Sequence, residues 1–154
     1  MITVSDTTAI TTLLKVGRVD LLTSLFGQVL IPAAVEHELR QHHGVLPACC
    51  VVHRVADSER LRRLLQQADP GEAEAICLAV ERHADLLLID DKKGRRLAEV
   101  EGVRCLGLPA LVLAAWQQQI IPSVPGFLDL MEQRGNYCLS ARAKAELERL
   151  AGQS

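Results

Sequence analysis

The sequence predicts an α/β fold in three layers, with a central, mostly parallel sheet between two layers of helices. Short apolar segments such as residues 86–89 lack alternating polar positions, which is typical of strands buried on both faces. Segments with helical periodicity separate these strands, and this succession indicates a parallel sheet. The length of 154 residues suits a single domain, residues 1–154, with one hydrophobic core region of ordinary size.

In the first half of the chain, glycine and proline mark the ends of the expected elements. A short apolar strand ends at Asp6, and the two helices that follow are closed by Gly17 and Gly27. Pro32 separates the next strand from the next helix. In order, we expect a strand at 1–6, helices at 7–17 and 18–27, a strand at 28–32, a helix at 33–43, a strand at 50–55 and a helix at 57–68.

In the second half, a capping pattern opens the first helix. Asp69 can cap this helix, Pro70 suits its first position, and Glu72 completes a capping box. A continuous apolar run then predicts the next strand. In order, we expect a helix at 69–84, a strand at 85–90, a helix at 92–102, a strand at 103–107, and helices at 108–119, 125–134 and 140–151.

The composition excludes several kinds of binding surface. Aromatic residues make up 3% of the chain, too few for a surface that stacks nucleic-acid bases. The net charge of −2 gives no general attraction to RNA, so a polyanion would need a local basic patch or a metal ion. The five cysteines lack C-x-x-C spacing, which indicates reduced thiols. No apolar stretch approaches the ~20 residues of a membrane span, so we expect a cytoplasmic protein without membrane contact.

Carboxylates follow two of the expected strands. Asp6 ends the first strand, and Asp90 and Asp91 follow the strand at 85–90. The carboxyl ends of parallel strands lie at one edge of the sheet, where ligand sites form. Helix capping is the simpler explanation for Asp6 and Asp91. It does not explain Asp90, because Asp91 already occupies the cap position.

Acidic residues on two helices could join this edge. Glu72 lies in the first turn of its helix, where the capping box would equally explain it. Glu74, two positions further on, points to another side of the helix and is expected in solvent. On the helix at 33–43, either Glu36 or Glu38 could face the strand ends, and periodicity does not decide between them.

Carboxylates gathered at one edge repel one another unless a cation lies among them. Oxygen ligands without His or Cys favour Mg²⁺ or Mn²⁺, which can activate water and stabilise a phosphodiester transition state. We therefore expect a divalent-cation site formed by Asp6 with Asp90 and Asp91. Four cations directly after this pair could hold a phosphate backbone, although a solvated helix face also explains them: Lys92, Lys93, Arg95 and Arg96.

Five strings in the chain resemble the PIN-domain family, and they occur in the family's order over residues 3 to about 115. They are VSDTTAITTLLKVGRVDLL, FGQVLIPAAVEHEL, DPGEAEAICLA, ADLLLIDDKKGRRLAE and GVRCLGLPALVLAA. The resemblance is strongest to a bacterial and archaeal branch of that family. It implies a PIN-like sheet between helices and a Mg²⁺- or Mn²⁺-dependent endoribonuclease, such as the VapC-type toxins of toxin–antitoxin pairs.

The resemblance also assigns roles by position. It selects Glu38 rather than Glu36 as the second family acid, and it leaves the last acid open between Asp90 and Asp91. Two departures from the toxin pattern, Ile89 in place of Thr and Glu72 in place of Asp, put the toxin role in question more than the metal site. The implied catalytic residues are Asp6, Glu38, Glu72, Asp90 and Asp91, the implied metal ligands are Asp6, Asp90 and Asp91, and the implied RNA-binding residues are Thr7, Lys92, Lys93, Arg95 and Arg96.

The leading expectation is therefore a metal-dependent ribonuclease, the toxin-like member of a toxin–antitoxin pair. The alternative is a PIN-domain protein that binds nucleic acid or regulates without cleaving. The expected partners are an RNA substrate, a small antitoxin and a second copy of the chain. A homodimer is expected because the helices between Leu108 and Leu150 offer more apolar surface than a small sheet needs, and because such PIN proteins often pair.

Overall fold

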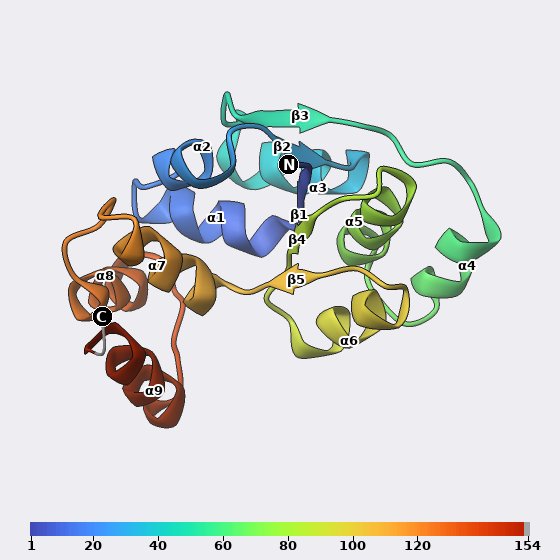
Figure 1. The fold of residues 1–154 in the computed structure, drawn as a ribbon. Coiled ribbons are helices and arrows are strands. Elements are labelled where there is room, and N and C mark those ends of the chain that lie inside the picture. The colour runs from blue at the N-terminus through green and yellow to red at the C-terminus, as the bar shows by residue number, and fades with distance from the viewer. Residues whose placement is uncertain (153–154) are drawn as a thin grey trace.

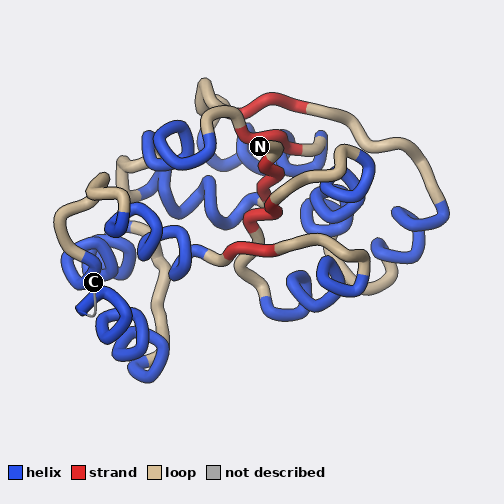
Figure 2. The backbone as a smooth tube through the Cα atoms, in the orientation of Figure 1, coloured by secondary structure: helices blue, strands red, loops and turns tan. Residues whose placement is uncertain are grey.

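Five short parallel strands form the centre of the computed structural model, which describes residues 1–152 (Figures 1 and 2). Every neighbouring pair is parallel, and the strand order is β3-β2-β1-β4-β5. Helices flank both faces of this sheet, which confirms the expected α/β fold. The strands are β1 (Thr3–Ser5), β2 (Val29–Ile31), β3 (Cys50–Val52), β4 (Leu86–Leu88) and β5 (Cys105–Leu106).

The helices occur where the sequence predicted them, with small differences at their ends. Gly17 and Gly27 follow the first two helices with a φ of 72°, a left-handed conformation that glycine adopts at little cost. The helices are α1 (Thr7–Lys15), α2 (Asp20–Phe26), α3 (Ala33–His43), α4 (Glu59–Leu65), α5 (Pro70–Glu81), α6 (Lys92–Val100), α7 (Leu108–Gln117), α8 (Val124–Arg134) and α9 (Ala141–Gly152).

Each face of the sheet has its own hydrophobic core, and β4 contributes to both. Leu87 and Ile89 pack with Val4 against α4, α5 and α6. Leu88 faces the other side and packs in the core formed with α1, α2, α3, α7, α8 and α9. Figure 1 shows α4 to α6 grouped on one side of the sheet and α1, α2 and α7 on the other. Burial on both faces explains why residues 86–89 are continuously apolar.

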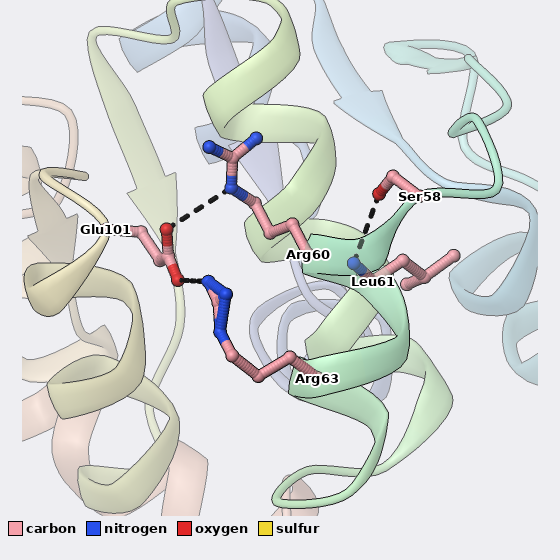
Figure 3. A network of polar contacts seen from close by, with 5 residues as sticks. All are labelled: Ser58, Arg60, Leu61, Arg63 and Glu101. Atoms are coloured by element: carbon pink, nitrogen blue, oxygen red, sulfur yellow. Dashed lines mark hydrogen bonds and ion pairs between the residues drawn. The ribbon is translucent and has the colours of Figure 1, made fainter.

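Ion pairs connect α4 to the residue that follows α6 (Figure 3). Ser58 caps α4 by accepting a hydrogen bond from the Leu61 N–H at 3.1 Å. Arg60 donates to one carboxylate oxygen of Glu101 at 3.2 Å, and Arg63 donates to the other. The side chain of Glu101 is only 14% exposed, and each of its two carboxylate oxygens pairs with one of the arginines. These two cations therefore serve the fold.

Two further features concern the chain as a whole. The five cysteines are free thiols. Within residues 1–152, no helix combines the length and the apolar character that crossing a membrane requires.

Candidate metal centre

The carboxyl ends of β1 and β4 lie side by side in the middle of the sheet. Ser5 pairs with Leu88, and the Asp6 N–H donates to the Leu88 carbonyl oxygen at 2.9 Å. The chain proceeds from β1 toward β2 and from β4 toward β5, on opposite sides of this pair. Ligand sites of open α/β sheets form at such a reversal of strand order. Asp6 and the Asp90–Asp91 pair follow these two strands directly.

Helices α3 and α5 add carboxylates around Gly71, the second residue of α5. An ideal Cβ atom on Gly71 would lie 2.8 Å from Oε1 of Glu38 and 3.5 Å from Oδ1 of both Asp6 and Asp69. Any larger residue at position 71 would therefore displace the Glu38 carboxylate. Glycine here leaves room for three carboxylates from β1, α3 and the start of α5 to surround one point.

Asp6 is the most buried acid of this group, with 5% of its surface exposed. Desolvation raises its pKa to about 7, although a hydrogen bond from the Thr7 N–H opposes the shift. The charges of Asp69, Glu38 and Asp91 contribute, in that order, to the same rise of this pKa to about 7. Asp6 thus lies close enough to all three carboxylates to be affected by their repulsion.

Glu72 belongs to the same group of acids. Its pKa is raised to about 7, first by desolvation and then by the charges of Asp69, Asp6 and Asp91, whereas the charge of Lys93 opposes the rise. Asp69 accepts a hydrogen bond from the Glu72 N–H at 2.9 Å, so the expected helix cap is present. This bond uses the Glu72 backbone and leaves its carboxylate available to the site.

We refer to Asp6, Glu38, Asp69, Glu72 and Asp91 as the acidic cluster. Within residues 1–152, none of them forms an ion pair. Repulsion among carboxylates without a cation is unfavourable, and partial protonation of Asp6 and Glu72 relieves it only in part. A divalent cation in this position would relieve it more fully.

The structure separates Glu36 from Glu38 on α3. Glu36 forms an ion pair with Arg40 one turn along the helix, at 3.2 Å. Glu38 lies instead against Gly71 in the acidic cluster. The residues differ by about 200° around the helix axis, so only one of them can reach the strand ends.

Glu74 was expected in solvent, and this expectation is wrong. Its Oε1 accepts a hydrogen bond from the Ala34 N–H at 3.2 Å. Pro32, the residue before α3, offers no side-chain acceptor to the first turn of that helix. The free N–H groups of this turn therefore take an acceptor from α5.

Asp91 faces the acidic cluster and also caps α6. Its Oδ2 accepts a hydrogen bond from the Gly94 N–H at 2.8 Å, as the capping explanation predicted. Its charge nevertheless contributes to the raised pKa of both Asp6 and Glu72. One oxygen in the cap leaves the other available for a ligand.

Asp90 has different partners from its neighbour. Its Oδ1 accepts a hydrogen bond from the Leu108 N–H, the first of α7, at 2.9 Å. Burial and then a hydrogen bond to Asp90 raise the pKa of Tyr137. Arg95 lies on the same side, since its Nη1 and the Asp90 Oδ1 both approach Gly107, at 3.3 and 3.2 Å from an ideal Cβ. Asp90 therefore joins the end of β4 to the C-terminal helices.

The residues expected to bind RNA differ in their exposure to solvent. Thr7 Oγ1 is buried and has no hydrogen-bond partner within residues 1–152. Lys92, Lys93 and Arg96 are exposed on α6. Lys93 is the one whose charge acts on Glu72.

Sequence reasoning missed the contribution of two residues to the acidic cluster. Asp69 was interpreted only as a helix cap, and Gly71 was not singled out. The string DPGE contained a signal, because it places two acids and a glycine within the first turn of one helix. A helix start of this kind directs its cap residue and its N–H groups toward the same region as the strand ends.

The donor atoms of the acidic cluster suit Mg²⁺ or Mn²⁺, because all are carboxylate oxygens. Within residues 1–152, no three Asp, Glu, His or Cys side chains already form a ready-made ligand set. Mg²⁺ does not need one, since it keeps several waters and takes only one or two carboxylates directly. The remaining acids of such a site bind the waters of the ion.

Comparison with protein families gives a match over nearly the whole chain. The family model DUF3368, described as a PIN domain, matches residues 2–152. PIN domains are commonly nucleases and typically bind divalent metals. No curated protein and no solved structure matches the chain.

In the metal-free protein, stability is expected to fall as the pH rises from about 4 to about 7. Asp6 and Glu72, with pKa values raised to about 7, keep their protons in this range when the protein is folded. The unfolded chain has already lost them, since the ordinary values are 3.8 and 4.5. Because the folded state binds more protons, raising the pH favours unfolding.

Denaturant unfolding in EDTA at several pH values measures this effect. The Asp6→Asn protein lacks the Asp6 contribution, so it should exceed the parent in stability at pH 7.5 by about 1 kcal/mol or more. In the difference between the two proteins, the contributions of the carboxylates that they share to the free energy of unfolding cancel. Parallel stability curves across the whole pH range would contradict the raised pKa of Asp6.

A second prediction distinguishes Asp90 from Asp91. Asp91→Asn should weaken Mn²⁺ binding by more than about tenfold, with little loss of stability because Asn is also a good helix cap. Asp90→Asn should cost about 1 kcal/mol of stability, because a neutral acceptor replaces a charged one at Leu108 and Tyr137. It should leave Mn²⁺ affinity within a few-fold of the parent.

Calorimetric titration with Mn²⁺ and denaturant unfolding together measure both quantities for each variant. The reverse outcome, in which Asp90→Asn removes Mn²⁺ binding and Asp91→Asn does not, would assign the metal to Asp90.

Proposed function

The chain belongs to the PIN-domain family, and from this premise we propose that it is an endoribonuclease that hydrolyses RNA with Mg²⁺ or Mn²⁺. The observation that carries the proposal is the acidic cluster at the carboxyl ends of β1 and β4. Its carboxylates come from separate parts of the sequence, repel one another and have no ion-pair partner within residues 1–152. A purely structural role would not require this arrangement.

In this mechanism, Asp6 and Asp91 would hold the ion from the ends of the two strands. Glu38, Asp69 and Glu72 would accept hydrogen bonds from water at the site and would orient the water that attacks phosphorus. When bound, a divalent cation would lower the pKa of water and stabilise the charge that develops on the phosphodiester. Asp6 and Glu72 have raised pKa values without the ion, so its binding should release protons. Water is the nucleophile, and no covalent enzyme intermediate forms.

Cations on α6 hold the RNA beside the site. Lys92, Lys93 and Arg96 are exposed in the helix that begins directly after Asp91. The overall charge of −2 gives no long-range attraction, so contact with phosphates depends on such local groups. Arg95 is half-buried, with its Nη1 near Gly107, which makes it a weaker candidate for RNA contact than its three neighbours.

Cleavage of mixed cellular RNA tests the proposed activity. The parent protein should cut RNA with Mn²⁺ or Mg²⁺ and stop when EDTA is added. Asp6→Asn keeps the size of the side chain but removes a proposed metal ligand. The cleavage rate should therefore fall by more than the roughly tenfold to hundredfold that is typical when a residue supporting the metal ligands is changed. Asp129→Asn, at an exposed ion pair with Lys144, is the matched control and should cut like the parent.

The outcomes have separate meanings. Equal cleavage by the parent and Asp6→Asn would indicate a contaminant or another site. Failure of both to cut any of many RNAs would favour the alternative, a PIN-domain protein that binds nucleic acid or regulates without cleaving.

The proposal includes a toxin-like role with a small antitoxin as partner. The unpaired carboxylates support it, because an antitoxin could insert a cation such as an Arg side chain among them. Expression of the parent chain alone should then slow growth, while Asp6→Asn should not. Equal growth with both proteins, at equal amounts of folded protein, would remove the toxin role and leave the nuclease.

We also propose that the chain forms a homodimer through its C-terminal helices. Much of their apolar surface packs in the core with α1 and α2, but Trp116 is only half-buried. With Ile121 and Pro122 it borders a hollow of about 490 Å³. Light scattering should give twice the chain mass of 16.8 kDa. A monomer mass at micromolar and higher concentrations would contradict the dimer.

A further inference from the structure

A groove of about 420 Å³ leads away from the acidic cluster between α1 and α3. Both helices contribute to its lining: α1 supplies Thr7, Thr8, Thr11 and Lys15, and α3 supplies Glu38, His42 and His43. The nuclease proposed above uses Glu38 and leaves most of this groove without a role.

The spacing of the lining residues sets the direction of the groove. Thr7, Thr11 and Lys15 are four residues apart and therefore share one face of α1. At 1.5 Å per residue, they extend over roughly 12 Å. Glu38 and His42 are likewise one turn apart on α3. One end of the groove thus lies at the acidic cluster, and the other end is formed by Lys15 and the two histidines.

The chemistry of the lining suits a sugar-phosphate chain. Lys15 is exposed and has no ion-pair partner within residues 1–152. The His43 ring lies 3.3 Å from the Thr11 hydroxyl. Glu38 is the one acid among the lining residues. Hydroxyls, imidazole N–H groups and a lysine can all make contacts to phosphate and sugar oxygens.

The lining also disfavours other ligands. Its only rings are the two histidine imidazoles, and it contains no Phe, Tyr or Trp and no large apolar side chain that could receive the anchor of a peptide. Contacts from the groove lining to RNA would therefore be made to the sugar-phosphate backbone and would depend little on base sequence.

We propose that this α1–α3 groove binds the backbone of single-stranded RNA next to the bond that is cut. The proposal rests on the nuclease function and adds a second set of contacts to those of α6. Lys15, His42 and His43 hold phosphates away from the metal, while the hydroxyl of Thr11 hydrogen-bonds to the chain as it approaches the acidic cluster.

Binding of a fluorescein-labelled uridine 20-mer, followed by anisotropy in EDTA, tests the groove. All proteins carry Asp6→Asn so that the probe stays intact. Lys15→Gln and the double change His42→Ala with His43→Ala should each weaken binding about tenfold. Lys15→Gln should also reduce the slope of log affinity against log salt by about 0.7, the value for one lost phosphate contact to a single strand.

Matched controls lie outside the groove. Arg134→Gln removes one exposed positive charge from α8, and His37→Ala removes an exposed histidine from α3 itself. Both should bind the 20-mer like the Asp6→Asn protein. Thermal unfolding confirms that the groove variants fold, and in the otherwise unchanged enzyme the same changes should raise KM more than they lower kcat.

The results separate this proposal from the nuclease function. If the parent cuts RNA but the groove variants bind the 20-mer as tightly as the controls, the groove proposal is wrong and the nuclease stands. If the groove variants lose binding but the parent cuts no RNA, the nuclease is wrong and a backbone-binding groove stands. Equal loss in groove and control variants would overturn the groove, because it would show only a general effect of charge.

Discussion

The pairing of β1 with β4 determines the position of every part of the candidate site. The hydrogen bond from the Asp6 N–H to the Leu88 carbonyl oxygen belongs to this register. After these two strands the chain continues to opposite halves of the sheet, from β1 to β2 and from β4 to β5. Asp6 and Asp91 are brought together by this register although 84 residues separate them in the sequence. The cores on the two faces hold the strands in place, so helices α3 and α5 can present their acids to the same point.

The acidic cluster is locally unfavourable and depends on the stability of the surrounding fold. Asp6 is buried beside other carboxylates and has no cation partner within residues 1–152, which costs free energy in the metal-free protein. Gly71 makes the close approach of Glu38 possible. Violations of ordinary burial rules are concentrated at functional sites, and a divalent cation would convert the repulsion into binding energy.

The elements of the fold were predictable because local rules determine them. Strands buried on both faces are apolar throughout, as at residues 86–89, and Gly17 and Gly27 end helices by their own conformational freedom. The site was predictable in part, since Asp6, Glu38 and Glu72 gather as expected. The roles of Asp90 and Glu74 were not predictable from local rules, because they depend on distant backbone groups: Asp90 accepts a hydrogen bond from the N–H of Leu108, and Glu74 accepts one from the N–H of Ala34. The cap that Asp91 forms at Gly94 is local and was predicted. Asp69 shows the same limit, since a helix cap and a site residue have the same local pattern.

Anomalous scattering from crystals soaked in Mn²⁺ tests the central claim most directly, because it locates the ion without relying on activity. The account predicts a Mn²⁺ peak between the carboxylates of Asp6 and Asp91, with Glu38, Asp69 and Glu72 close enough to bind its waters. It predicts no peak at Asp90, whose carboxylate serves α7 and Tyr137. A peak away from Asp6, or no peak at a Mn²⁺ concentration that supports RNA cleavage, would contradict it.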